Sequence, residues 1–206
     1  MKLIECVPNF SEGRRQEVMD AIVNSMKESA NVIILDVEAD PSHNRMVVTM
    51  VGEPQQVLSA MKNGARKAVE LIDLNQHQGE HPRIGAVDVV PFVPLFNATM
   101  QECNELALEF GQWMWDELKV PVYLYAESAR MPERKRLPNI RKGEFEGLKE
   151  AIKEPERHPD IGEPVIHPTA GATAVGARNF LIAFNLYLNT ADKGVADKIA
   201  KAVRES

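Results

Sequence analysis

The chain has 206 residues, of which 44% are hydrophobic and 26% are charged, and it carries a net charge of −6. This composition is typical of a globular protein that buries a core, and it excludes a largely disordered or fibrous chain. The acidic balance argues against a general binder of nucleic acid or of acidic membranes, because such proteins need a basic excess.

The cysteine content and the N-terminal sequence bear on the cellular compartment. Cys6 and Cys103 are the two cysteines, which is too few for a disulfide framework and fits a reducing environment. Glu5 interrupts the apolar run that a signal peptide would need, and no apolar stretch approaches the roughly 18 residues of a membrane span. We therefore expect a cytoplasmic protein with no membrane partner and no nucleic-acid partner.

The first 95 residues predict alternating strands and helices. Strands are expected at 2–10, 31–39, 45–52 and 86–95, and helices at 14–29 and 54–73. Pro91 and Pro94 indicate an edge position or a strand end for 86–95. The order β-α-β-β-α-β is that of the ferredoxin-like fold, so the sequence predicts an α+β, two-layer sandwich.

The second half predicts further strands and helices that extend this core. A helix at 99–119 should begin with a capping box formed by Thr99 and Glu102. The remaining elements in chain order are a strand at 120–128, a helix at 143–154, a long irregular segment at 155–179, a strand at 180–189 and a helix at 191–205.

The stretch HQGEH, residues 77–81, concentrates two histidines and a glutamate ahead of an apolar run. It matches the H-x-x-E-H zinc pattern, but that pattern requires a continuous helix. Gly79 and Pro82 disfavour a helix here, and no third ligand is evident. A polar loop and an acid–base site are the other two interpretations.

The acid–base interpretation rests on the chemistry of the side chains beside His81. An imidazole titrates near working pH, so it suits proton transfer. Glu80 is placed to orient the ring or to steady its protonated form, and Arg83 is suited to bind an anionic substrate.

Five blocks of sequence, in order along the chain, resemble the glutamate formiminotransferase family. They are ECVPNFSEG (5–13), GEHPRIGAVDVVPFVP (79–94), VPVYLY (120–125), LPNIRKGEFEGL (137–148) and GATAVGARNFLIAFN (171–185). The resemblance implies transfer of a formimidoyl group from 5-formimidoyltetrahydrofolate to L-glutamate, at the end of histidine degradation. Tetrahydrofolate would be a co-substrate, and no metal would be needed.

The resemblance also implies roles for individual residues. The histidine of the GEHPR motif is the general base in that family, and it falls on His81. Glu38 matches an acidic position that would orient His81 or bind the amine, while Asn9 and Arg45 are weaker candidates. The folate-contacting segment falls on Gly162, Glu163, Pro164, Val165, Ile166, His167, Pro168, Thr169, Ala170 and Gly171, with Arg178 available to a carboxylate.

The family's transferase unit has two subdomains with the folate between them. The resemblance assigns residues 1–179 to the first subdomain and 180–206 to the opening strand and helix of an otherwise absent second one. We expect a homodimer, because an exposed apolar strand at 180–189 favours pairing. The alternative function is a non-catalytic or partner-dependent subunit that binds folate or serves assembly, with a separate chain supplying the second subdomain.

Overall fold

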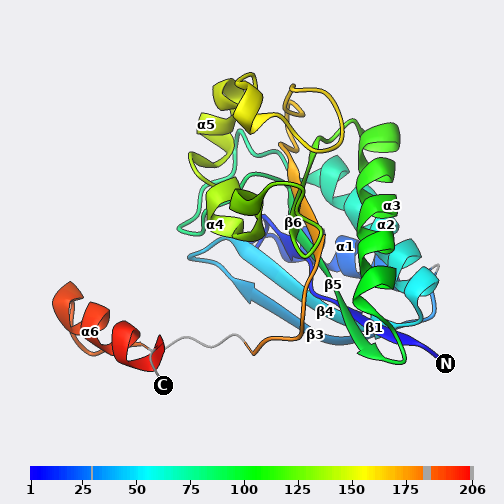
Figure 1. The fold of residues 1–206 in the computed structure, drawn as a ribbon, viewed down its shortest axis with the longest axis horizontal. Coiled ribbons are helices and arrows are strands. Elements are labelled where there is room, and N and C mark those ends of the chain that lie inside the picture. Colours follow the sequence, from blue (N-terminus) through cyan, green and yellow to red (C-terminus); the bar gives the residue numbers. More distant parts are fainter. Residues whose placement is uncertain (29, 183–186, 205–206) are drawn as a thin grey trace.

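The computed structural model describes residues 1–28, 30–182 and 187–204. Its centre is a seven-stranded mixed sheet with helices on both faces (Figure 1). The strands are β1 (Leu3–Cys6), β2 (Asn9–Phe10), β3 (Val32–Asp40), β4 (Arg45–Gly52), β5 (Val87–Phe96), β6 (Val122–Ala126) and β7 (Thr173–Ala177). The helices are α1 (Gln16–Glu28), α2 (Pro54–Leu71), α3 (Met100–Leu118), α4 (Leu137–Ile140), α5 (Glu144–Ala151) and α6 (Lys193–Arg204), with 3-10 turns η1 (Pro132–Lys135) and η2 (Pro155–Arg157).

The first half of the chain has the predicted ferredoxin-like arrangement. β4 lies between β3 and the pair β1/β2, and β5 lies on the other side of β1/β2, with all these pairings antiparallel. The α+β class is therefore confirmed. The sheet continues beyond this core through β7 and then β6, which run parallel to β5.

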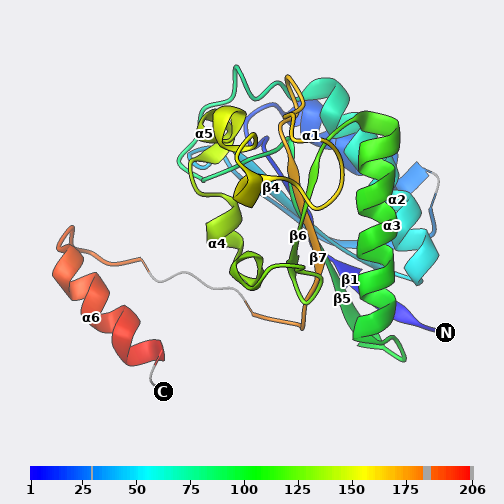
Figure 2. The ribbon, with the colours of Figure 1, turned by 45° about the horizontal axis from the view of Figure 1, so that its top comes forward.

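Two clusters of buried side chains hold the layers together. The larger one lies between the sheet and the layer formed by α1, α2 and α3, which cover one face (Figures 1 and 2). The smaller one lies on the opposite face, where Ile140 of α4 and Leu148 of α5 pack against Tyr123 and Tyr125 of β6. The second face is thus covered beside β6 and β7, whereas Ile33, Leu35 and Val37 of the edge strand β3 are exposed.

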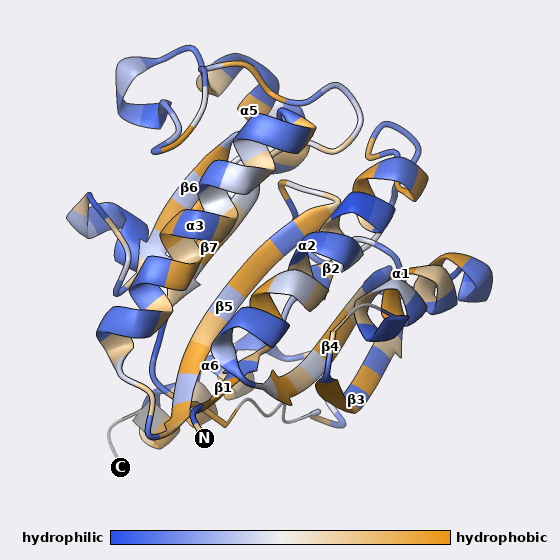
Figure 3. Ribbon diagram, turned by 90° about the vertical axis from the view of Figure 1, so that its right-hand side faces the viewer, coloured by the Kyte–Doolittle hydropathy of each residue, from blue (hydrophilic) through white to orange (hydrophobic). Residues whose placement is uncertain are grey.

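The expected edge position of residues 86–95 is wrong, because β5 is a central strand that pairs with β1, β2 and β7. Figure 3 shows it as hydrophobic along most of its length. Pro91 has no N–H to donate to a neighbouring strand. It is tolerated because this part of β5 faces the gap between β1 and β2, where its carbonyl accepts from the N–H of Val7, so no hydrogen bond of the sheet is lost on that side. Pro94 lies past Phe92, the last residue of β5 that pairs with β7.

The expected irregular segment 155–179 contains a strand that the sequence pattern did not reveal. β7 is completely buried between β5 and β6, and its sequence TAVGA is short and lacks alternation. The capping box at Thr99 and Glu102 is confirmed. Of the predicted strand at 180–189, residues 180–182 and 187–189 are not in a strand, and residues 183–186 lie outside the described residues.

The C-terminal helix α6 begins at Lys193, close to its expected start, and lies apart from the layered body in Figures 1 and 2. In the described part of the chain, none of the helices has the length and apolar character needed to cross a membrane.

Candidate active site

The histidine stretch forms a loop that is tied to the turn between β3 and β4. Nε2 of His77 donates to the carbonyl oxygen of Asn44 at 2.8 Å, and Nδ1 of His77 accepts from Nε of Arg83 at 3.2 Å. The Asn44 side chain donates to the carbonyl of Gln78 at 3.0 Å and accepts from the N–H of Gly13 at 2.9 Å. His77 and Asn44 therefore fix where residues 77–83 lie relative to β4.

The side chain of Arg83 is buried and all its donors are used. Besides the bond to His77, it pairs with Glu144 at 2.9 Å and with Glu146 at 2.6 Å, both from α5, and its Nη2 also reaches the His77 carbonyl. The hydrogen bonds and charge of Glu146, together with Glu144, raise the pKa of Arg83 against the opposing effect of burial. The structure thus gives Arg83 a positioning role and leaves none of its hydrogens for the expected contact with a substrate anion.

His81 points toward residues of β2 and β4 on the sheet face opposite α1–α3. Nη1 of Arg45 donates to Nε2 of His81 at 3.1 Å and to Oδ1 of Asn9 at 3.0 Å. Because a guanidinium is only a donor, Nε2 of His81 must carry the lone pair. The sequence named Arg45 and Asn9 as weaker candidates, and the structure brings both together with His81.

The surroundings of His81 keep its imidazole neutral. Burial, followed by the charges of Arg141, Arg45 and His43, lowers the pKa of His81 from 6.5 to about 3. Burial and the charge of Arg141 also lower the pKa of Arg45. Two arginines close to one half-buried histidine create a local excess of positive charge, which is suited to an anionic ligand.

Arg141 comes from the basic stretch that precedes α5, and it is anchored by Asp88 at the start of β5. One oxygen of the buried Asp88 carboxylate pairs with Arg141, while the other accepts from the N–H of Ile84 at 2.7 Å. Arg134 in the same stretch is buried against Asp160 at 2.7 Å. These two arginines therefore belong to the folded interior and are not part of a solvated loop.

A second histidine lies beside His81. Nδ1 of His43, in the β3–β4 turn, donates to Oδ2 of Asp40 at 2.6 Å. The His43 and His81 rings meet edge to face, with centroids 6.2 Å apart. Hydrogen bonds from the backbone and the side chain of His43 lower the pKa of Asp40.

Glu80 and Glu38, the two acidic residues expected to act on His81, are both exposed to solvent. The side chain of Glu80 is exposed, and its backbone N–H donates to the Ser42 carbonyl. Glu38 is exposed on β3 opposite Val47 of β4, and its charge raises the pKa of Arg45. Glu38 thus acts through Arg45 on the group of polar side chains around His81. Among the described residues, neither the Glu80 nor the Glu38 carboxylate accepts a hydrogen bond from His81.

The expected folate segment, Gly162 to Gly171, forms a closed loop beside α3. Its neighbours are Trp115, against which Gly162 lies, and Ile84, whose carbonyl lies against Gly171. His167 and Gly171 exchange both backbone hydrogen bonds, and Nδ1 of His167 accepts from the N–H of Ala170 at 2.9 Å. A pocket of about 500 Å³ lies between this loop and the end of α3.

The remaining folate candidate, Arg178, lies at the other end of β7. Its backbone N–H donates to the Phe92 carbonyl at 3.1 Å. Its charge lowers the pKa values of Glu5 and Tyr125 against the larger effect of burial, which raises both. Among the described residues, no contact joins the 162–171 loop to the His81 ring.

The zinc interpretation of HQGEH finds no geometric support. His77 donates to Asn44 and His81 accepts from Arg45, so the two rings have different partners. Throughout 1–28, 30–182 and 187–204, no three His, Cys, Asp or Glu side chains are gathered as a metal site would require.

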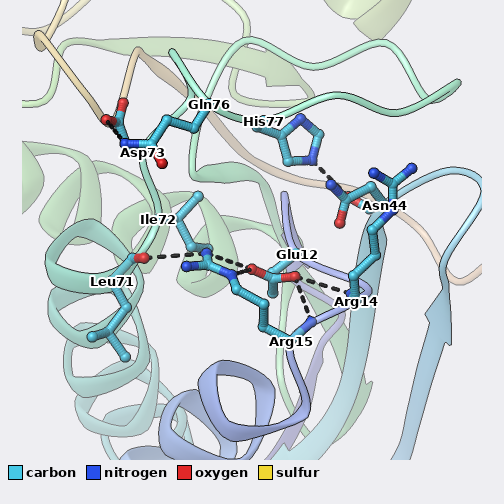
Figure 4. A pocket seen from close by; sticks show the side chains of 9 residues that line it. All are labelled: Glu12, Arg14, Arg15, Asn44, Leu71, Ile72, Asp73, Gln76 and His77. Carbon is cyan, nitrogen blue, oxygen red and sulfur yellow. Dashed lines mark hydrogen bonds and ion pairs between the residues drawn. The ribbon is translucent and has the colours of Figure 1, made fainter.

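The pocket drawn in Figure 4, about 360 Å³ in volume, is lined by His77 and not by His81. Its buried carboxylate, Glu12, accepts hydrogen bonds from the backbone N–H groups of Arg14 and Arg15 and from the Arg15 side chain. Those contacts satisfy Glu12 within the chain. We therefore place the candidate site on the sheet face around His81.

Comparison with known proteins identifies the family of the chain. The profile of the formiminotransferase domain, N-terminal subdomain, matches residues 3–178. The chain belongs to this family. Formiminotransferase relatives include a glutamate formimidoyltransferase of Streptococcus pyogenes serotype M1, 48% identical over 205 residues, which cover 100% of this chain and 69% of the relative. A glutamate formimidoyltransferase of Thermoplasma acidophilum is 48% identical over 206 residues, 99% of this chain and 68% of the relative.

The family also contains longer proteins. The formimidoyltransferase-cyclodeaminase of Rattus norvegicus is 50% identical over 204 residues, which cover 99% of this chain and 38% of the relative. The chain thus spans well under half the length of such relatives.

Four residues of the candidate site around His81 were not predicted from the sequence, namely Asp40, His43, Asp88 and Arg141. The turn sequence DPSHN (40–44) was a usable signal, because a histidine in a tight turn next to a strand has a fixed position. No local signal marked Asp88 and Arg141, which are 53 residues apart.

Proposed function

We propose that this chain carries the formimidoyl-transfer chemistry of its family, moving the group between 5-formimidoyltetrahydrofolate and L-glutamate in histidine degradation, with His81 as general base. The observation that carries the proposal is the neutral imidazole of His81, held with Asn9 and Arg45 on one face of the sheet. The names of the relatives supply the reaction and its acceptor, glutamate.

The charges around His81 suit the two substrates, which are both carboxylates. In the described part of the chain, Arg45 donates hydrogen bonds through Nη1 alone, so its Nε and Nη2 hydrogens are available to an anion. Arg141 adds a second positive charge. A bound carboxylate would offset both cations and raise the pKa of His81 from about 3 toward the range in which an imidazole is an effective base.

The reaction then follows from these positions. The α-amine of glutamate attacks the amidine carbon after it loses a proton, and His81 takes a further proton from the nitrogen of the adduct. The bond between that carbon and N5 of the folate breaks, its electron pair stays on N5, and N5 gains one proton in place of the one that the adduct nitrogen gave up. Glu38 acts on this site through Arg45, and Arg83 holds the loop that carries His81.

Two measurements on the 206-residue chain test this function. Calorimetric titration with folinic acid, a stable folate analogue, should show binding that the His81→Ala variant retains, since His81 acts in the chemical step. A transfer assay with glutamate should show activity in the unmodified chain and none in the variant. Activity in His81→Ala equal to that of the unmodified chain would exclude His81 as the base.

A partner-dependent folate-binding subunit is the second candidate function. It is favoured by apolar side chains exposed on the edge strand β3, Ile33 and Leu35, which are 65% and 60% exposed. Folinic acid binding without transfer would support this function. Sedimentation across micromolar concentrations would show whether the chain forms the homodimer that its sequence suggests.

A further inference from the structure

The histidine in the β3–β4 turn lies beside His81 and is held by a carboxylate. His43 donates through Nδ1 to the Asp40 carboxylate, and its ring meets that of His81 edge to face. A carboxylate behind an imidazole fixes the tautomer and steadies the protonated ring. Nδ1 is engaged, so Nε2 is the nitrogen that remains for proton transfer.

The turn that carries His43 is held rigidly. Oδ1 of Asp40 accepts from the backbone N–H groups of Ser42 at 2.8 Å and of His43 at 3.0 Å. The carbonyl oxygen of His43 lies so close to Gly79 that a Cβ there would come within 2.2 Å of it. The turn and the loop of His81 therefore fit closely, and the two imidazoles keep a defined separation.

Formimidoyl transfer needs two proton transfers at different nitrogens. The amine nitrogen becomes cationic when it attacks and must lose a proton, whereas N5 of the folate must gain one as it leaves. A single imidazole can take the first proton and return it to the second nitrogen, whereas a second imidazole beside it offers a donor that needs no such return. His81 starts neutral, so it is suited to take up the first proton.

We propose that His43, held by Asp40, is a second acid–base residue that protonates the departing folate nitrogen and is recharged by His81. This inference rests on the proposed function. It assigns a role to a residue that the family resemblance did not suggest.

The steps balance in atoms and charge. The amine forms an N–C bond to the amidine carbon, and His81 takes a proton from the resulting cationic nitrogen. The C–N5 bond then breaks, its electron pair stays on N5, and His43 gives N5 its proton while the amidine double bond re-forms. The proton on His81 passes to His43, directly or through one water molecule, and both rings return to their starting states. Nothing is oxidised or reduced.

The charged groups around the two rings support a transfer in this direction. Arg45 from β4 and Arg141 from the segment after α4 lower the pKa of His81 and therefore favour loss of its proton. Asp40 at the end of β3 faces His43 and accepts a hydrogen bond from its Nδ1.

The test compares kcat, KM and the pH profile of kcat for His43→Gln, Asp40→Asn and a matched control, His158→Gln. His158 contacts the Lys153 carbonyl, away from the site, so its variant should behave as the unmodified chain. His43→Gln should lower kcat by about 100-fold with KM within about twofold, as expected for loss of one proton-transfer group. Asp40→Asn keeps the oxygen that accepts from the turn and should lower kcat by a smaller factor.

Imidazole added to His43→Ala should restore part of the lost kcat, which a structural role of the ring would not allow. Unchanged kcat and an unchanged pH profile in His43→Gln, with His81→Gln inactive, would overturn the relay and leave the proposed function intact. If the unmodified chain transfers nothing, the proposed function fails and the relay fails with it. If His43→Gln does not fold, Asp40→Asn decides by the same readouts.

Discussion

Arg83 donates its Nε–H to Nδ1 of His77 at 3.2 Å, and so the arginine of the GEHPR motif supports the first histidine of the stretch rather than the second. His77 passes this support on to Asn44 in the β3–β4 turn. The two histidines of HQGEH therefore differ in their contacts: His77 joins the loop to the turn, and His81 meets Arg45 of β4. Four predictions follow from this division.

Replacing Arg83 should cost stability before it affects substrate binding. Arg83→Met would leave Nδ1 of His77 and the carboxylates of Glu144 and Glu146 without their partner. We expect a loss of about 2–3 kcal/mol in urea unfolding, below the value for fully buried pairs because both glutamates are partly exposed. Glu146→Gln is the milder control. A stable Arg83→Met chain with a raised KM for folate would contradict this assignment.

Gly79 should tolerate no side chain. A Cβ there would come within 2.2 Å of the His43 carbonyl oxygen and 2.8 Å of the Asn44 Cβ, so Gly79→Ala must move the loop away from the turn. Gly147→Ala in α5 is a matched control, because a Cβ at Gly147 meets nothing within 4 Å and alanine favours a helix. Transfer activity should fall at least about tenfold in the first variant, since displacement of a catalytic group by about 1 Å has effects of this size or larger. Equal activity in the two variants would show that the close fit has no part in the reaction.

The pKa of His81 should respond to its neighbours. Arg45→Gln removes one of the cations that depress it, so the pKa of His81 should rise above about 3. Folinic acid and glutamate, added to the unmodified chain, should raise it as well. NMR titration of the His81 ring protons measures both effects, and Arg136→Gln, an exposed site in the same chain, controls for the change in net charge. A titration of His81 that is the same in all these samples would refute the electrostatic account.

Stability should fall with acid in a way that depends on His81. Its pKa in the folded chain lies below its ordinary value of 6.5, so the unfolded chain binds this proton first as the pH drops. The contribution is fully present above pH 6.5 and is lost progressively toward pH 3. Burial lowers the pKa values of His77 and His167 as well, so they add to the same trend.

The measurement for this prediction is the urea midpoint of the unmodified chain and of His81→Gln, near neutral pH and again midway through the acid window. His81→Gln lacks the titrating ring and should lose less stability between the two conditions. Parallel losses in the two chains would mean that His81 is not the buried neutral group described above.

The sequence predicted those parts of this architecture that depend on local pattern. Helical periodicity located α1, α2 and α3, and the loop character of HQGEH followed from Gly79 and Pro82. What it missed depends on contacts between distant residues. The role of Arg83 is set by glutamates 61 and 63 residues further along the chain, and β7 is a strand because β5 and β6 flank it. A pattern read along the chain carries no information about such partners.

The gap between β1 and β2 fixes the register of the first strand against β5, and so the position of Asn9 in the site. Val7 and Pro8 occupy it opposite Pro91, at a point where neither proline has an N–H to give. If the first strand slipped by one residue, a residue that needs a backbone hydrogen-bond partner would lie opposite a proline. The same slip would turn Asn9 to the helix side of the sheet. These prolines thus exclude the neighbouring registers, and Asn9 stays where it meets Arg45.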